Sequence, residues 1–369
     1  MADKEKSGDE EEPTIAEDLV VTKYKMAGEI VNRILKEVIK KCEAGKGVRE
    51  ICEWGDAQLM EETAKVFKKE KEMKKGIAFP TCLSVNNCIC HFSPLENEPD
   101  VVLQEGDVVK VDLGAHIDGF SAVVAHTFVV GATKDAKVKG RKADAILAAY
   151  NASEAALRLL RPGNTNNQIT EMVSKVAEQY ECKPIEGMLS HRIERNKIDG
   201  GKSIIQNPTE SQRKEHEKAE FDVHEGREME SKVNIFKKTE ETYMLKLKAS
   251  RGFYSDVEKR FGLMPFNIRL LEDEKKARMG LVECVKHKLV DPFQVLYEKR
   301  ELYESEHKIK DNEISSLLHK AVNEKSAKRN KKKKSGKSAG GDGPKAEPEI
   351  TPPTSVSANG EPVAVVAES

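Results

Sequence analysis

Long apolar runs are missing from this 369-residue chain, and so is a recognisable export signal. No run approaches the roughly 18 residues that a membrane-spanning helix needs, so we expect no membrane insertion. The N-terminus is acidic at residues 9–12, whereas a secretion signal has basic and then apolar residues. The seven cysteines are odd in number and unevenly spaced, which favours reduced thiols in an intracellular protein over a disulfide framework.

Aromatic residues are also scarce, at 5% of the chain, and no aromatic-rich RNA-binding module is recognisable. Charged residues make up 34% and hydrophobic residues 38%, while the formal net charge is only −1. This balance suits a soluble protein with long polar tails. The length is enough for one large or two ordinary domains.

Apolar periodicity predicts a mixed α and β chain. A capping box at Thr14–Glu17 is expected to open a long helix with one buried stripe: Val20, Tyr24, Ala27, Val31, Ile34 and Val38. Further expected helices are 48–67, 140–161, 165–181 and about 301–323. Strands are expected at 77–91 and 107–130, and short strands with loops at 184–225. Residues 243–290 are mostly helical in pattern, with a strand-like Met244–Lys248 segment ahead of them.

Residues 107–130 read as two alternating strands around a turn at Ile117-Asp118-Gly119. Asp112 lies on the first strand and Val123 on the second. Side chains that pair across an antiparallel ladder point to the same face of the sheet. Asp112 and Val123 are therefore expected on the same face. A second carboxylate at 123 would complete a cation clamp, which valine cannot do.

Specific segments resemble those of known proteins. They are Thr14–Met26, Glu70–Thr81, Val85–Cys88 with His91–Pro94, Pro184–His191, Glu272–Gly280 and the lysine run at 331–334. The hairpin resembles the metal-binding strand pair of type-2 methionine aminopeptidases. The chain as a whole is more similar to the non-peptidase branch of that family, the proliferation-associated, ErbB-receptor-binding homologues. The similarity covers about 14–225 and 233–299.

The resemblance implies an α/β (α+β) fold of the pita-bread, aminopeptidase-like kind. We expect this domain at 14–299, with a helical insert at about 243–290. Outside it we expect a disordered acidic N-terminus at 1–13, a C-terminal helix at 300–323, and a disordered tail at 324–369, basic and then rich in Pro and Ser.

The sequence departs from the family at two places. After His224-Glu225, where the family has a central strand, residues 226–232 show no strand pattern. After Lys299 a further strand across the site is also missing. The fold is therefore expected to be incomplete, with unpaired strand edges. A splice form, an incomplete gene model and a truncated paralogue all remain open.

The resemblance also implies a dinuclear metal site of two Asp, one His and two Glu. This chain keeps Asp112 and His191 as vestigial ligands, has Val123 for the second Asp, and lacks both Glu-bearing strands. One carboxylate cannot neutralise two divalent ions in a partly buried cavity. We therefore expect no catalytic residues, no bound metal and no cofactor. His91 matches a substrate-contacting histidine and is expected either as a pocket residue or as a hydrogen-bonded sheet histidine.

Other candidate ligands have plainer interpretations. Cys82, Cys88, Cys90 and His91 suggest zinc, but the Cys-x-Cys-His spacing is unlike the usual ligand gaps, so buried apolar thiols are the better prediction. His116 and His126 flank the hairpin and are expected to be structural.

A basic run without any acidic residue is the main candidate for nucleic-acid binding. Its eight members are Lys325, Lys328, Arg329, Lys331, Lys332, Lys333, Lys334 and Lys337. Such a run can neutralise phosphates or serve as a nuclear address, or it can be a solvated linker. Two other sets could add to the surface or be solvated helix faces: Lys68, Lys69, Lys74 and Lys75, and the insert residues Lys246, Lys248, Arg251, Lys275, Lys276 and Arg278.

Ile314-Ser-Ser-Leu317-Leu318 resembles a Leu-x-x-Leu-Leu partner helix, with its apolar residues on one helix face. Either a partner groove or the protein's own body could cover that face.

Together these features favour a non-catalytic regulator of growth, translation and transcription. The resemblance implies structured RNA, ribosomes or pre-ribosomal particles as partners, with nuclear regulatory proteins and a receptor tyrosine kinase cytoplasmic region as further ones. It implies a location in cytoplasm and nucleus, including the nucleolus. The alternatives are a metal-dependent methionine aminopeptidase and a truncated isoform that competes for partners.

Overall fold

The computed structural model describes residues 13–209, 212, 233–297 and 309–320. The basic run at 325–337, the C-terminal tail and both departures from the family lie outside these residues. The described chain forms two compact units. The first holds 13–137, 191–202 and 233–297, and the second holds 138–190, 203–209, 212 and 309–320.

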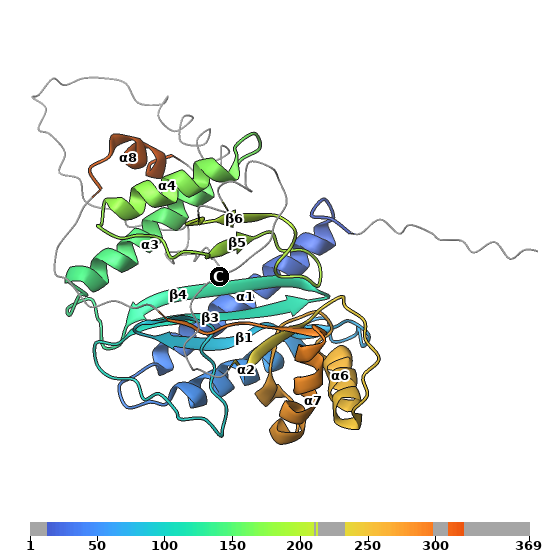
Figure 1. Ribbon diagram of the computed structural model, residues 1–369. Helices are drawn as coiled ribbons and strands as arrows, with labels where there is room; N and C mark the ends of the chain where they lie inside the picture. The colour runs from blue at the N-terminus through green and yellow to red at the C-terminus, as the bar shows by residue number, and fades with distance from the viewer. Residues whose placement is uncertain (1–12, 210–211, 213–232, 298–308, 321–369) are drawn as a thin grey trace, which may run out of the picture. The chain divides into compact units, whose positions relative to one another are not determined.

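The first unit is built on a three-stranded antiparallel sheet in the order β1-β3-β4 (Figure 1). Its strands are β1 (Lys75–Val85), β3 (Val108–Ile117) and β4 (Phe120–Val129). Helices α1 (Asp18–Lys41) and α2 (Val48–Ala64) pack against it. On β3, alternate residues Val109, Val111, Leu113, Ala115 and Ile117 are fully buried. The opposite pleat therefore carries Asp112, Gly114 and His116.

The predicted hairpin is confirmed. Ile117 pairs with Phe120, so the turn has two residues, and both Asp118 (φ 56°) and Gly119 (φ 80°) have positive φ. This is the geometry of the type I′ turn that Asp-Gly favours. The Asp118 carboxylate accepts hydrogen bonds from Lys23 at 2.5 Å and Arg195 at 2.9 Å, which anchor the turn to α1 and to the 191–202 segment.

The first helix begins later than the capping box predicts. Helix α1 starts at Asp18, with Glu17 as its N-cap. Glu17 Oε1 does accept from the Thr14 backbone N–H at 3.1 Å, but the Thr14 hydroxyl accepts from Ala16, so the reciprocal bond is not made. The predicted stripe is otherwise confirmed, because five of its six members are buried and Tyr24 packs edge-on against Phe120 with ring centroids 5.3 Å apart.

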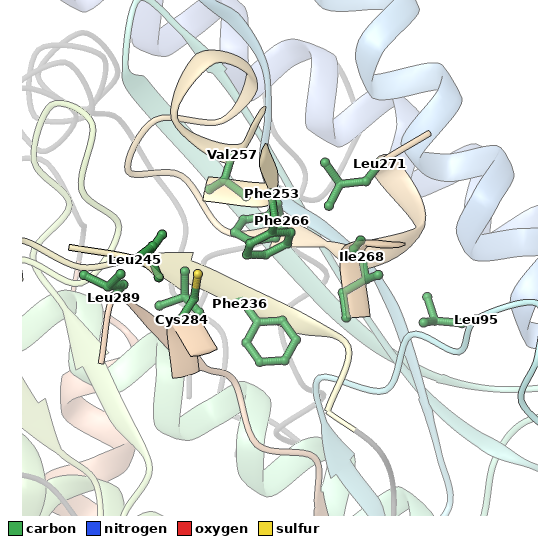
Figure 2. Close-up of a cluster of buried hydrophobic side chains, with 12 residues drawn as sticks. Leu95, Phe236, Leu245, Phe253, Val257, Phe266, Ile268, Leu271, Cys284 and Leu289 are labelled. Atoms are coloured by element: carbon green, nitrogen blue, oxygen red, sulfur yellow. The ribbon is translucent and has the colours of Figure 1, made fainter. Parts of the chain in front are cut away.

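Residues 233–297 add a second antiparallel sheet and two helices to this unit. The sheet has the order β8-β7-β9, from β7 (Ile235–Lys238), β8 (Phe266–Asn267) and β9 (Val290–Pro292). Helices α6 (Lys248–Arg260) and α7 (Glu274–Lys286) pack together, and the 3-10 turn η1 spans Ile268–Leu270. Figure 2 shows their shared core, which includes Phe236, Phe253, Phe266, Leu289 and Cys284. A two-residue strand, β10 (Leu296–Tyr297), pairs with β2 (Cys88–Cys90).

The strand predicted at Met244–Lys248 is wrong. Residues 244–247 form no strand, and Lys248 begins α6. The backbone N–H groups of Lys246 and Leu247 donate to the Glu283 carboxylate at 2.8 and 3.1 Å, which replaces the partners a neighbouring strand would supply. Of this segment's apolar residues only Leu245 is buried, while Met244 is 87% exposed.

The second unit holds α3 (Gly140–Leu159), α4 (Asn166–Glu178), β6 (Ser203–Ile205) and α8 (Asn312–Leu318). The short strand β5 (Leu189–His191), which pairs with β6, belongs to it up to residue 190. Helices α3 and α4 pack against each other. Ile314 and Leu317 of α8 are buried in the same core, and Leu318 packs against it. The Leu-x-x-Leu-Leu-like face is therefore covered by the protein's own body. The remainder of the helix predicted at 301–323 lies outside the described residues.

Within the described ranges, the long helices are too polar to cross a bilayer. The longest, α1, has 24 residues and carries charged side chains along its outer face. No described helix combines the length and the apolar character of a membrane span.

Candidate functional site

The face of the hairpin that carries Asp112 is closed by apolar side chains. Asp112 pairs with Ala125 and Gly114 pairs with Val123, so Asp112 and Val123 are diagonal neighbours on one face. Val123 is only 8% exposed. It belongs to a buried cluster with Ala78, Phe79, Cys82, Ile198, Ile235 and Met264. The position that a second carboxylate would need is thus part of a hydrophobic core.

Asp112 lies at the edge of that cluster, opposite its member Cys82. Two irregularities in the β1–β3 register bring Cys82 directly opposite it. Burial raises the pKa of Asp112 to about 6, while the nearby His91 and a hydrogen bond with Cys82 act in the opposite direction. Burial therefore makes the ionised form of Asp112 less favourable than that of an exposed aspartate.

His91 sits in an aromatic cluster. Its ring lies 5.6 Å from Phe79 and 5.4 Å from Phe293, measured between centroids, and its Nδ1 is 2.9 Å from the Gln294 carbonyl oxygen. It is only 9% exposed, and its φ of 63° is unusual for a residue other than glycine. His91 follows the last residue of β2 and is hydrogen-bonded there, while its role as a pocket residue stays a prediction.

His191, the second residue that matches a metal ligand of the family, lies near the positively charged side chain of Lys237. It ends β5 and is half-buried. Burial lowers the pKa of its imidazole, and the positive charge of Lys237 lowers it further. Lys237 is itself held by an ion pair with Asp199. A metal ion bound by His191 would meet the repulsion of this ammonium group.

Among the residues that the structure describes, no three or more His, Cys, Asp or Glu side chains are grouped to hold a metal. Cys82, Cys88 and Cys90 are buried and form no disulfide, as the apolar interpretation predicts. His116 is 8% exposed, and its Nδ1 accepts from the Gly119 backbone N–H at 3.3 Å, so it supports the turn. His126 is an exposed residue of β4.

Comparison with known proteins places this geometry in a family. The model of metallopeptidase family M24 matches residues 22–226, more than half of the chain. ErbB-3 binding protein 1 of Solanum tuberosum is 44% identical over 314 residues, covering 81% of this chain and 79% of that protein. The curved DNA-binding protein of Schizosaccharomyces pombe is 45% identical over 296 residues, covering 76% and 77% respectively.

The chain belongs to metallopeptidase family M24. Its likeness to ErbB-3 binding protein 1 confirms the resemblance found in the sequence. A solved structure of a thermophilic Arx1 aligns with a TM-score of 0.73 and 30% identity, over 83% of this chain and 99% of that one. The expected mixed α/β pita-bread fold is thereby confirmed.

The basic residues that the sequence offered as nucleic-acid contacts fall into two groups in this M24 chain. Some are exposed, and others make hydrogen bonds or ion pairs within the protein. Lys68, Lys69 and Lys74 are exposed. Lys75 is not a solvated charge, because its ammonium group donates to the carbonyls of Val66 and Phe67, at 2.7 and 3.3 Å, just beyond the end of α2. A positive charge at this position is favourable because the C-terminal end of the helix dipole is negative.

The same distinction holds in the insert. Lys246, Lys248, Lys275 and Lys276 are exposed. Arg251 donates to the carbonyls of Leu245 and Lys246, and Arg278 pairs with Glu98 at 3.1 Å. Arg251 therefore braces the start of the insert, Arg278 joins the insert to Glu98 outside it, and the four lysines are exposed on its surface.

Two buried or half-buried ion pairs escaped the sequence interpretation. Arg269 and Asp56, with side chains only 5% and 3% exposed, pair at 2.6 Å. Asp56 also accepts from the Thr81 backbone N–H at 2.7 Å, and Arg269 donates to the Ser93 hydroxyl at 2.5 Å. A signal was present, because Asp56 stands within the buried stripe of α2. The pair of Lys237 and Asp199 had no such signal.

Proposed function

We propose that this M24 chain is a non-catalytic protein that binds RNA and protein partners. The observation that carries the proposal is the buried position of Val123 beside Asp112. A dinuclear site holds its ions with several carboxylates, whose charges offset the ions' own. One carboxylate facing two divalent ions leaves three positive charges uncompensated, which is prohibitive in a partly buried site.

The relatives support a binding role. The potato relative is named for binding ErbB-3, and the fission-yeast relative for binding curved DNA. Both are similar to this chain over about three quarters or more of its length. From the family resemblance found in the sequence we propose pre-ribosomal or ribosomal particles, nuclear regulatory proteins and a receptor tyrosine kinase cytoplasmic region as partners.

The basic run at 325–337 supports a nucleic-acid partner, for which we propose RNA. Its eight positive charges without a negative one suit the phosphate backbone, which gives affinity without base specificity. Such a run also suits nuclear import, so we propose that the protein occupies cytoplasm and nucleus, including the nucleolus.

A titration of the full chain against structured RNA, run beside a methionine-release assay, tests the proposal. RNA binding at low salt without release of methionine is the expected result. Metal-dependent release without RNA binding would instead favour the aminopeptidase alternative, for which the retained Asp112 and His191 are the supporting observation.

A further inference from the structure

A pocket on the first unit lies far in sequence from the hairpin and plays no part in the arguments above. It forms where α1 ends and α2 begins, and has a volume of about 320 Å³. Trp54, the only tryptophan of the chain, lines it together with the buried Ile51. A pocket of this size can hold a small flat ligand.

Three lysines line the pocket, and one of them, Lys40, also pairs with Glu37 at 2.7 Å. Lys40, Lys41 and Lys46 line the pocket, and the Lys41 Nζ lies 4.5 Å from the centre of the Trp54 ring. Lysines in the last turn also favour the dipole of α1, which accounts for Lys40 and Lys41 but not for Lys46. Exposed cation–π contacts are weak, so an incoming ring can displace Lys41 from the indole face.

The pocket is held in shape by the backbone. The loop between the helices bonds to residues 101–103 through Gly45 N–H to Leu103 O at 2.8 Å, Leu103 N–H to Lys46 O at 2.9 Å, and Val48 N–H to Val101 O at 2.9 Å. Gly45 has a φ of +87°, which a residue with a side chain rarely adopts. A ligand would therefore meet a preformed site and would not have to order the loop.

We propose that this pocket binds an unpaired base of a single-stranded nucleic acid. The base stacks on Trp54, and its flanking phosphates lie beside Lys40, Lys41 and Lys46. Stacking on an aromatic side chain with lysines along the backbone is the usual way in which proteins hold single strands. The site rests on the proposed RNA-binding function and adds a contact on the folded body to it.

Two carboxylates in the same pocket narrow the ligand further. Glu43 and Glu50 line it beside the lysines. Their oxygens can accept hydrogen bonds from the exocyclic amino groups of cytosine, adenine or guanine. Uracil has no such donor, so oligo(C) and oligo(A) should bind more tightly than oligo(U).

The single tryptophan makes the test local. In low salt, hexamers of C or A should quench Trp54 fluorescence saturably, while a hexamer of abasic nucleotides with the same charge should not. The protein used should be the full chain carrying Lys331, Lys332, Lys333 and Lys334→Ala, so that the basic run does not dominate binding. If oligonucleotides quench Trp54 in this variant, and the salt dependence of their affinity differs from that of the parent protein, the pocket binds independently of the basic run.

Substitution supplies the second readout. Binding of a labelled C hexamer, followed by anisotropy, should weaken about 5- to 100-fold in Trp54→Leu, the range expected for one stacked base. Trp54→Phe keeps an aromatic face and should retain most of the affinity. Absent quenching, equal quenching by the abasic hexamer, or unchanged affinity in Trp54→Leu would overturn the proposal. Quenching by polyglutamate but not by oligonucleotides would overturn it in favour of an acidic protein partner.

Discussion

Val123 lies directly opposite Gly114 across the β3–β4 ladder, and its Cγ2 is 3.1 Å from where a Cβ on Gly114 would be. The same imagined Cβ would lie 3.0 Å from the Phe79 backbone nitrogen. The valine therefore fills space that the glycine leaves open, beneath β1. This packing makes position 123 a core position and gives Asp112 an apolar neighbour there in place of a carboxylate.

Val123→Asp should therefore destabilise the protein and should not create a metal site. Burying a carboxylate in an apolar cluster costs several kcal/mol, and we expect a loss of about 3 kcal/mol in the free energy of unfolding. Urea denaturation measures it. Val123→Ala is the matched control, with a loss of about 1–3 kcal/mol from the cavity alone and no response to metal. A Val123→Asp protein that is stabilised by Mn²⁺ or Co²⁺ would contradict this account.

Asp112 should make stability depend on pH. Its folded-state pKa of about 6 exceeds the ordinary value of 3.8, so the native state holds a proton that the unfolded state releases. The contribution of Asp112 to the free energy of unfolding is thus fully present below pH 3.8, and it is lost as the pH rises through 6.

Asp112→Asn removes that dependence. We expect it to raise the free energy of unfolding at pH 8 by on the order of 1–3 kcal/mol, and to have little effect at pH 4. Thermal melts at the two pH values measure the difference. A variant less stable than the parent at pH 8 would mean that the ionised carboxylate makes favourable contacts and contradicts a burial penalty.

The pair of Arg269 and Asp56 should matter far more than a surface pair. Asp56→Ala leaves a buried guanidinium without its partner, and we expect a loss of about 3–5 kcal/mol in urea denaturation. Lys175→Ala is the control, because its pair with Glu313 has side chains 47% and 64% exposed and should contribute less than about 1 kcal/mol. Equal losses in the two variants would rule out a special role for the buried pair.

The buried and half-buried ion pairs show which contacts the sequence could and could not predict. The hairpin and the long helices follow from local signals, since Asp118-Gly119 selects its turn and the stripe of α1 has the helical period. Arg269 and Asp56 are 213 residues apart in the chain, and Lys237 and Asp199 are 38 apart. No local pattern specifies such contacts, because they arise only when distant elements pack.

The wrong strand at Met244–Lys248 has a similar origin. Its alternating apolar and basic residues fit a strand, but the Glu283 carboxylate on α7 takes the backbone N–H groups of Lys246 and Leu247. In the candidate site, too, some features could be predicted from the sequence and others could not. Asp112 and Val123 could be placed on one face from the sequence, whereas the ammonium group of Lys237 beside His191 could not.

Methionine release should be absent. We expect no turnover of Met-Ala-Ser peptides with added Co²⁺ or Mn²⁺, because Asp112 and His191 lack the other carboxylates that hold a dinuclear centre. An active methionine aminopeptidase assayed in parallel controls for the metal and the substrate. Residual turnover that survives Asp112→Ala would indicate a contaminant. Turnover that both Asp112→Ala and chelation abolish would contradict a non-catalytic role.

The salt dependence of RNA binding tests the central claim most directly. Each phosphate contact on a single strand contributes roughly 0.7 to the slope of log affinity against log salt, so four to six contacts predict a slope of about −3 to −4. Replacing Lys331, Lys332, Lys333 and Lys334 with Ala should flatten that slope and weaken binding alike for unrelated RNA sequences, whereas Ser335→Ala in the same run should change neither. A four-lysine variant with the parent's affinity and slope would contradict the assignment of RNA binding to this run.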